Sequence, residues 1–210
     1  SITLTFSANA QLLLRDDFHM KNDYWFYRSD GNQSIPIVKD GTLQLKLINA
    51  VGSEYCNTEI YDPTEPYLPG TILRTRLKCL PQHVGSRGWG FWDGDLTLID
   101  IFLEYDVAWI MQQKSDFTEE KYNWFLFGVA SDSLSNKQAI SLQNKINENE
   151  WHTYKIIWEE NFTSLFIDDE LFYLVNSNIP NDKMRFDVWL DNRVINIEDA
   201  SEFWNNNSQG

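Results

Sequence analysis

The chain has 210 residues, of which 42% are hydrophobic and 15% aromatic. This composition excludes a disordered chain, and the length suits one folded domain, because β-sandwiches reach about 200 to 250 residues undivided. The net charge of −14 argues against nucleic acid and anionic membranes as partners, and no apolar stretch approaches the about 18 residues of a membrane span.

The expected elements are short strands. Apolar or alternating runs end in Gly, Pro, Asn or Asp clusters about every ten residues, which is typical of an all-β protein. The first clear signal is a hairpin, in which residues 34–38 lead through Asp40-Gly41 into the alternating run 42–47. Further strands are predicted over residues 71–80, 89–92, 103–113, 123–130, 151–159, 163–167, 170–175 and 183–190.

The second half of the chain favours antiparallel pairing. Within residues 151–175, three alternating runs separated by tight turns predict a meander. Residues 62–70, with three prolines, and residues 131–150, rich in Asn, Ser and Gln, are expected to be surface loops, with a short helix in 133–144 as an alternative for the second. Since no internal repeat or composition shift divides the chain, residues 1–210 are predicted to be one domain.

The cysteine and histidine residues give little indication of a disulfide or a metal site. Cys56 and Cys79 fall in segments expected to be neighbouring strands, and free thiols are favoured over a disulfide. His83 and His152 stand apart, and no His or Cys cluster has the spacing of a metal site. The compartment and the oligomeric state stay open at this level.

Several segments resemble glycoside hydrolase family 16, and they follow one another in that family's order. Residues 16–25 and 40–43 are similar to its opening, and residues 151–171 to a Trp-His-Thr-Tyr strand that leads into an Asp-Gly-type turn. Residues 85–92, Gly-Ser-Arg-Gly-Trp-Gly-Phe-Trp, resemble the segment before its catalytic strand, and residues 184–189 its closing strand. The resemblance covers most of the chain. It implies a concanavalin A-like fold, a two-sheet antiparallel jelly-roll sandwich with a concave ligand-binding face, as in legume lectins and endo-glucanases.

The family's catalytic motif is the part that this sequence does not reproduce. In the motif Glu-x-Asp-x-x-Glu, a nucleophile and an acid/base lie about 5.5 Å apart on one strand face. Here Glu104-Tyr105-Asp106 keeps the first half, whereas Trp109 stands in place of the acid/base. The register that ends at Glu104 has Leu98 at the nucleophile position. Without a proton donor, ordinary glycoside hydrolysis is not expected.

Rings and amides near the Trp-rich segment are the candidate ligand-binding groups, because flat aromatic faces stack on sugars and on apolar skeletons. The alternative for each ring is a place in the core, since alternate residues of a strand face inward. The amides of Gln112 and Gln113 need partners, either in the protein or on a ligand. The candidates are Trp89, Phe91, Trp109, Met111, Gln113, Phe125, Phe127 and Trp189.

Three carboxyl groups are candidate proton donors. Glu104 and Asp106 are two residues apart and share a strand face, where like charges raise one pKa. The alternative for them is a solvated strand end. Asp187 lies beside Trp189 in the segment that resembles the family's closing strand, which borders the cleft.

These observations lead to a primary interpretation and three alternatives. The primary one is binding of a neutral carbohydrate or similar small molecule in an aromatic-lined concave cleft, without hydrolysis. The alternatives are an isomerase or cyclase for an apolar terpenoid- or polyketide-like substrate, a family 16-like glycosidase, and an interaction domain whose rings are all core. No cofactor is expected, although the oxygen ligands of Asp16, Asp17 and Asp191 leave a structural calcium ion open.

Overall fold

The computed structural model describes residues 1–6, 11–31, 35–47, 55–64, 66–80, 84–93, 106–116, 123–131 and 137–194. These residues form strands and turns without a helix. Consequently, nothing in the described ranges could cross a membrane as a helix.

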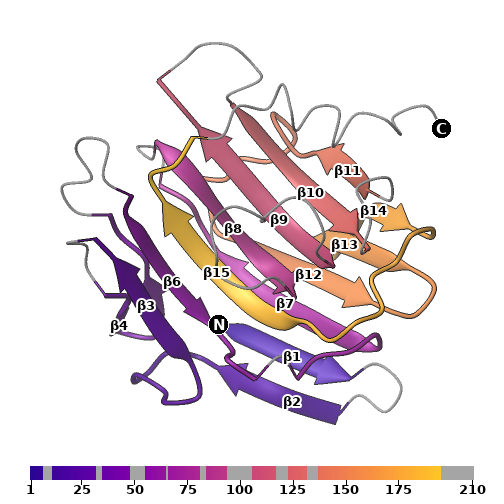
Figure 1. Ribbon diagram of the computed structural model, residues 1–210, viewed down its shortest axis with the longest axis horizontal. Coiled ribbons are helices and arrows are strands. Elements are labelled where there is room, and N and C mark those ends of the chain that lie inside the picture. The colour runs from indigo at the N-terminus through magenta and orange to yellow at the C-terminus, as the bar shows by residue number, and fades with distance from the viewer. Residues whose placement is uncertain are drawn as a thin grey trace.

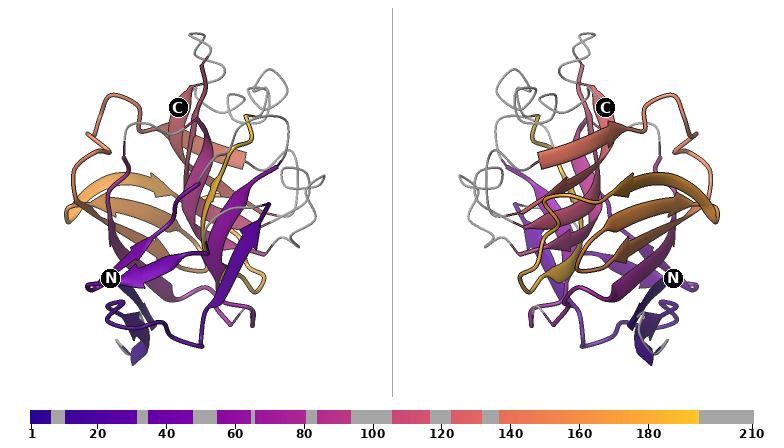
Figure 2. Two further views of the ribbon diagram at one scale, coloured as in Figure 1. Left: turned by 90° about the vertical axis from the view of Figure 1, so that its left-hand side faces the viewer. Right: turned by 90° about the vertical axis from the view of Figure 1, so that its right-hand side faces the viewer.

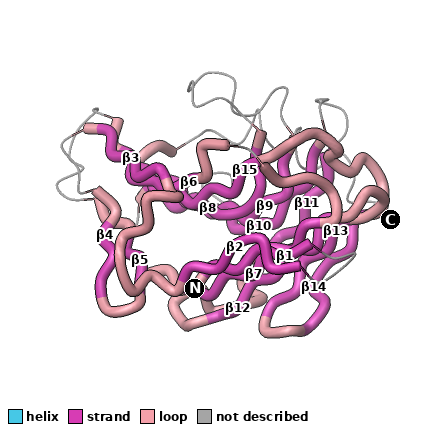
Figure 3. Tube along the Cα trace, turned by 90° about the horizontal axis from the view of Figure 1, so that it is seen from below, coloured by secondary structure: helices cyan, strands magenta, loops and turns pink. Residues whose placement is uncertain are grey.

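The strands form two large antiparallel sheets that pack as two layers (Figure 3). The six-stranded sheet has the order β14 (Glu170–Val175), β13 (Thr163–Ile167), β12 (His152–Trp158), β7 (Thr71–Leu77), β1 (Ile2–Phe6), β2 (Gln11–Asp16). The seven-stranded sheet has the order β11 (Lys137–Ser141), β10 (Trp124–Ala130), β9 (Val107–Lys114), β8 (Gly85–Trp92), β15 (Arg185–Asp191), β6 (Asn57–Tyr61), β3 (Phe26–Asp30). Figures 1 and 2 show this sheet from its face and from both sides. The prediction of an all-β jelly-roll sandwich is confirmed.

Local turn chemistry explains the hairpins. The small hairpin of β4 (Ile37–Lys39) and β5 (Thr42–Gln44) turns through Asp40 and Gly41, with φ of 52° and 73°. Positive φ at both positions is what a two-residue turn between twisted strands requires. Asp168 and Asp169, with φ of 51° and 67°, make the same kind of turn between β13 and β14. The predicted meander is therefore confirmed.

The core lies between the two layers and is built from alternate residues of the facing strands. Trp89 of β8 meets Tyr154 of β12 with ring centroids 5.0 Å apart, and Phe91 meets Trp158 at 5.3 Å. All four rings are at most 2% exposed. Burial of aromatic side chains on this scale supplies much of the driving force for folding.

The segment predicted to be a loop or a helix contains a strand instead. Residues 137–141 form β11, which pairs with β10, and residues 143–145 form a turn. Residues 142–150 then cross from the seven-stranded to the six-stranded sheet at one end of the sandwich. The helix alternative is wrong for residues 137–144. β11 pairs with β10, and its side chains Ala139 and Ile140 pack against the two faces of the sheet.

Candidate functional site

The seven-stranded sheet has a second face, turned away from the core, which we call the outer face. A group of side chains is buried on it as a separate apolar cluster: Trp92, Val107, Trp109, Met111, Leu126 and Ala130, with Trp124, Ala139 and Trp189 packed against it. The rings of Trp92 and Trp109 have centroids 5.8 Å apart, and those of Trp109 and Trp189 lie 5.1 Å apart. Three indoles from three adjacent strands thus form one continuous aromatic layer.

Glycines make room for this layer. Gly88 of β8 pairs with Trp189 of β15, and a Cβ at Gly88 would overlap the Cζ2 and Cη2 atoms of that indole. The ring therefore lies directly over bare backbone. Its Nε1 donates a hydrogen bond of 3.2 Å to the hydroxyl of Ser86, two residues before Gly88 on the same face.

The candidate ligand-binding residues divide between the two faces. Trp109, Met111, Gln113 and Trp189 share the outer face. The other four, Trp89, Phe91, Phe125 and Phe127, belong to the core between the sheets, so the expectation that they line the outer face is corrected, although Phe125 also borders a pocket at the end of the sandwich. The reason is the alternation of side chains along each strand, in which Gly90 of β8 and Leu126 of β10 face outward and the rings on either side of them face inward.

No carboxylate projects from β9 on the outer face, although β9 follows the Trp-rich strand, as the family's catalytic strand does. Its outward residues are Val107, Trp109, Met111 and Gln113. Asp106, just before the strand, accepts hydrogen bonds from the backbone N–H groups of Asn181 and Asp182, at 2.9 and 3.1 Å. It anchors that loop. Glu104 lies outside the described residues.

Two carboxyl groups do meet elsewhere on the outer face. Asp187 of β15 lies diagonally across from Glu59 of β6, since Trp189 is the direct partner of Glu59, and the two carboxyls are hydrogen-bonded to each other. Both residues are 2% exposed. Asn57 Nδ2 donates to Glu59 Oε2 at 2.8 Å, and the Arg28 guanidinium lies 3.5 Å from the same oxygen.

Burial makes this pair hold a proton. Desolvation, followed by the nearby charge of Glu59, raises the pKa of Asp187 well above its ordinary value. Burial also raises the pKa of Glu59, while Asn57 and Arg28 oppose that shift. Because the pKa of Asp187 is raised further than that of Glu59, we place the shared proton on Asp187. We call the two the carboxyl pair.

Arg185 connects the carboxyl pair to the aromatic layer. Its guanidinium carbon lies 5.0 Å from the ring centre of Trp92 and 4.9 Å from that of Tyr61. It also acts to lower the pKa of both acids, which places positive charge beside them. The sequence predicts Asp187 as a site residue but not Glu59, because the position of Glu59 near Asp187 depends on the pairing of distant strands.

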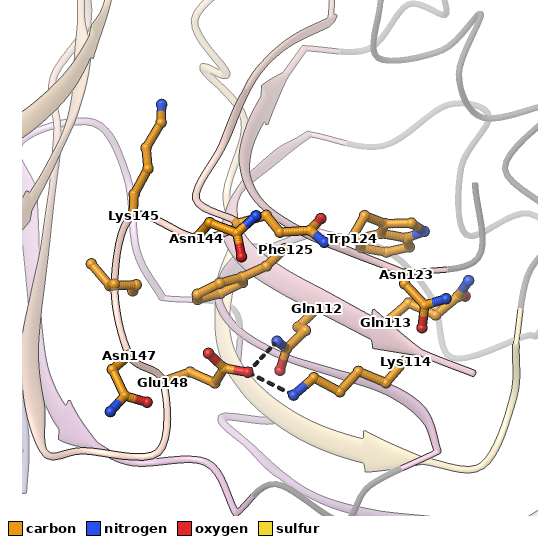
Figure 4. Close-up of a pocket in the computed structure, with 12 residues that line it drawn as sticks. Gln112, Gln113, Lys114, Asn123, Trp124, Phe125, Asn144, Lys145, Asn147 and Glu148 are labelled. Carbon is orange, nitrogen blue, oxygen red and sulfur yellow. Dashed lines mark hydrogen bonds and ion pairs between the residues drawn. The ribbon is translucent and has the colours of Figure 1, made fainter. Parts of the chain in front are cut away.

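A pocket of about 570 Å³ opens where β9 and β10 end and residues 142–150 cross between the sheets (Figure 4). We call it the end pocket. It is lined by Gln112, Gln113, Lys114, Asn123, Trp124, Phe125 and residues 143–148. Glu148 accepts hydrogen bonds from Gln112 Nε2 at 3.1 Å and from Lys114 Nζ at 2.6 Å. Although partial burial raises the pKa of Glu148, these bonds leave it below the ordinary value, so the carboxylate is ionised.

The oxygens proposed for calcium already have protein partners. Asp16 accepts hydrogen bonds from Trp25 Nε1 and the Phe18 backbone, and Asp191 from Ser86 and the Arg193 backbone. Within the described ranges, no three His, Cys, Asp or Glu side chains gather in a metal-binding group. A structural calcium ion stays a prediction.

Comparison with known proteins finds similarity in structure alone. No protein-family model matches the sequence, and no curated protein is detectably similar to it. A β-1,3-1,4-glucanase (lichenase) derived from a mouse hindgut metagenome is 16% identical, with a TM-score of 0.53 over 92% of this chain and 91% of that one. A family 16 protein of the Bacteroides ovatus mixed-linkage glucan PUL, in complex with a G4G4G3G product, is 12% identical, with a TM-score of 0.55 over 85% and 86%.

A third structure comes from work on endo-acting O-glycanases with which human gut bacteria initiate mucin breakdown. It is 10% identical, with a TM-score of 0.59 over 85% of this chain and 84% of that one. The protein thus has the concanavalin A-like fold of family 16 glycosidases, as the sequence resemblance predicts.

Proposed function

We propose that the protein binds a neutral glycan on the outer face of the seven-stranded sheet and does not hydrolyse it. The observation that carries this proposal is the layer of Trp92, Trp109 and Trp189, which occupies the sheet face where β9 offers no carboxylate. Its glucanase-type fold adds support, because solved structures with this fold include enzymes that act on glucans.

The chemistry of the outer face suits a sugar. Indole faces pack against the C–H faces of pyranose rings, while hydroxyl groups need donors and acceptors. Arg185 beside Trp92, and the carboxyl pair with Asn57 farther along β15 and β6, supply both kinds. Trp189 is the partly exposed member of the layer and is the natural first contact for a ligand.

The carboxyl pair argues against the glycosidase alternative. Retaining enzymes hold their two carboxyl groups about 5 to 5.5 Å apart, and inverting enzymes hold them farther apart, so that the glycosidic bond fits between them. Glu59 and Asp187 are hydrogen-bonded to each other and leave no such gap.

The same pair favours a second candidate, proton-transfer catalysis of the isomerase or cyclase type. A protonated Asp187 would give its proton to an unsaturated carbon or oxygen of an apolar substrate, and Glu59 would accept a proton from a neighbouring carbon. The exchange is balanced, since one proton enters and one leaves without oxidation. Indole faces stabilise the intervening positive charge.

The test is calorimetric titration with mixed-linkage β-1,3-1,4-glucan, laminarin and released mucin O-glycans. We expect one of the three to bind, and Trp109→Ala and Trp189→Ala to weaken that binding at least tenfold, because stacking on one ring contributes on the order of 1 kcal/mol or more. Trp151→Ala is the matched control, because Trp151 is 45% exposed and its ring lies away from the outer face, beside Arg76 of β7 and Lys78, which follows β7. Absence of binding to all three glycans would refute the proposal. Glycan release by the unmodified protein that is lost in Asp187→Asn would favour catalysis instead.

A further inference from the structure

We infer that the end pocket is a second binding site, which takes the terminal sugar unit of the glycan bound on the outer face. This inference builds on the proposed function, and it assigns a ligand to a cavity that lies away from the aromatic layer. A volume of about 570 Å³ falls within the range of small-molecule sites, about 300 to 1,000 Å³.

The base of the end pocket is held in place by a chain of hydrogen bonds. Arg87 Nε donates to Gln112 Oε1 at 2.6 Å, and Gln112 Nε2 donates onward to Glu148. Lys114 Nζ also donates a hydrogen bond to Glu148, at 2.6 Å. Gln112 is 4% exposed and has both ends of its amide occupied. A base fixed in this way needs no rearrangement before a ligand binds.

The charges at the base of the end pocket cancel, which favours a neutral ligand there. Lys114 and Glu148 neutralise each other. Lys145 is directed outward, with its Nζ 5.9 Å from the ring centre of Phe172 on β14, and Figure 4 shows its side chain extending away from the base. A phosphate or carboxylate ligand would therefore find no unpaired cation among the described residues at the base.

The remaining lining groups match a polyhydroxylated ligand. Amides from Gln143 and Asn144 each offer a donor and an acceptor, as hydroxyl groups do. Trp124 adds a ring, and its buried Nε1–H finds no acceptor within the described part of the chain. A buried donor left without a partner costs about 1 to 3 kcal/mol, and a ligand hydroxyl would satisfy it.

The end pocket borders the outer face at the ends of β9 and β10. Gln113 faces the outer side and also lines the end pocket, and Trp124 packs against the aromatic layer. Gln113 lies four positions beyond Trp109, which corresponds to about 13 Å of strand. A ligand stacked on Trp109 must therefore be an oligosaccharide to reach the end pocket.

The distance predicts that pocket variants affect long ligands only. Asn144 has a φ of 61°, so Asn144→Gly removes its amide without straining the backbone. Asn178→Gly is the matched control, because Asn178 is exposed, has a φ of 53° and lies outside the end pocket. Trp124→Phe keeps a ring and removes the N–H group.

The experiment is calorimetric titration of mixed-linkage β-glucan oligosaccharides of about two to six glucose units, enough to span the separation between the two sites. We expect Asn144→Gly with Gln143→Ala, and separately Trp124→Phe, to weaken hexasaccharide binding about three- to tenfold and to leave disaccharide binding unchanged. In the unmodified protein, the Trp124 indole N–H resonance should shift with the hexasaccharide and not with the disaccharide.

The outcomes separate the two proposals. Normal hexasaccharide affinity in both pocket variants, together with a loss in Trp109→Ala, would overturn the end-pocket site and leave the outer-face site in place. Failure of the unmodified protein to bind the hexasaccharide would overturn the end-pocket site, and absence of binding to all three glycans would overturn the outer-face site as well.

Discussion

The indole of Trp189 covers Gly88 of the neighbouring strand, so the aromatic layer depends on the absence of a single side chain. We expect Gly88→Ala to displace Trp189 and to lower the free energy of unfolding by about 1 to 3 kcal/mol, as other overpacking substitutions do. Urea unfolding measures the loss, and the fluorescence of Trp189 should shift with it.

The control for Gly88→Ala is the double variant Gly88→Ala/Trp189→Val. Because Trp189→Val removes the ring that the new methyl group would strike, Gly88→Ala should cost less in that background. Equal costs in the two backgrounds would show that the steric conflict lies elsewhere.

The carboxyl pair makes stability depend on pH. A buried acid whose folded-state pKa is raised favours the folded state while it is protonated, so stability falls as pH rises from the unfolded-state value of 3.8 to the folded-state value. Asp187→Asn keeps a hydrogen-bond donor and cannot ionise. We expect this variant to lose less stability than the unmodified protein between pH 3.8 and the folded-state pKa, measured by urea unfolding.

A residual pH dependence should remain in Asp187→Asn. Burial raises the pKa of Asp191 to about 6, despite hydrogen bonds from Ser86 and Arg193. Ionisation of this group therefore also lowers the stability of the protein as pH rises from 3.8 to about 6. Asp182→Asn, at an exposed position, serves as the control. An unchanged pH profile in Asp187→Asn would contradict the assignment of the proton to Asp187.

His152 stabilises the turn beside the end pocket through both ring nitrogens. Nδ1 lies 2.6 Å from Asp168 Oδ2 and Nε2 lies 3.0 Å from the carbonyl of Asn147, two acceptors that require a doubly protonated ring. Partial burial lowers the pKa of His152, but these bonds raise it above 6.5 overall. The stabilisation is complete below pH 6.5 and is lost as pH rises through the folded-state pKa.

NMR titration of the His152 ring tests this arrangement. Asp168→Asn removes the charge opposite Nδ1 and should lower the pKa of His152 towards its ordinary value. At high pH, backbone amides of residues 147–150 should exchange with solvent faster, because a neutral ring can no longer donate to both acceptors. A His152 pKa that is the same in Asp168→Asn would refute the bridge.

Cys56 and Cys79 are buried and are not joined by a disulfide, as favoured from the sequence. Burial raises the pKa of the Cys79 thiol, which lowers its thiolate fraction. We therefore expect little reaction of the folded protein with a thiol-specific disulfide reagent, and reaction of both thiols after unfolding in urea. A failure of either thiol to react in the unfolded chain would indicate a disulfide.

The sequence predicts the strands well because their signals are local. Alternation and the turn residues Asp40-Gly41 and Asp168-Asp169 are read within a few positions. Period two also shows which residues share a face, but not which face is the core, and for this reason the sequence wrongly places Trp89 and Phe91 on the ligand side. Glu59 could not be found, because its contact with Asp187 depends on the register of strands that are far apart in the chain. The assignment of the whole chain to one domain stays a prediction.

Seven of the eight residues of β9 are buried, so side chains on both faces of this strand pack against neighbours. The amides of Gln112 and Gln113 therefore lie on opposite faces of the sheet. Gln112 Oε1 accepts a hydrogen bond from Arg87 on the core side, and Gln113 borders the outer face. Inserting one residue into β9 before Gln112 would exchange the faces on which the two amides lie and would move each later side chain of the strand to the opposite face. We therefore expect β9 to tolerate single substitutions better than a one-residue insertion or deletion.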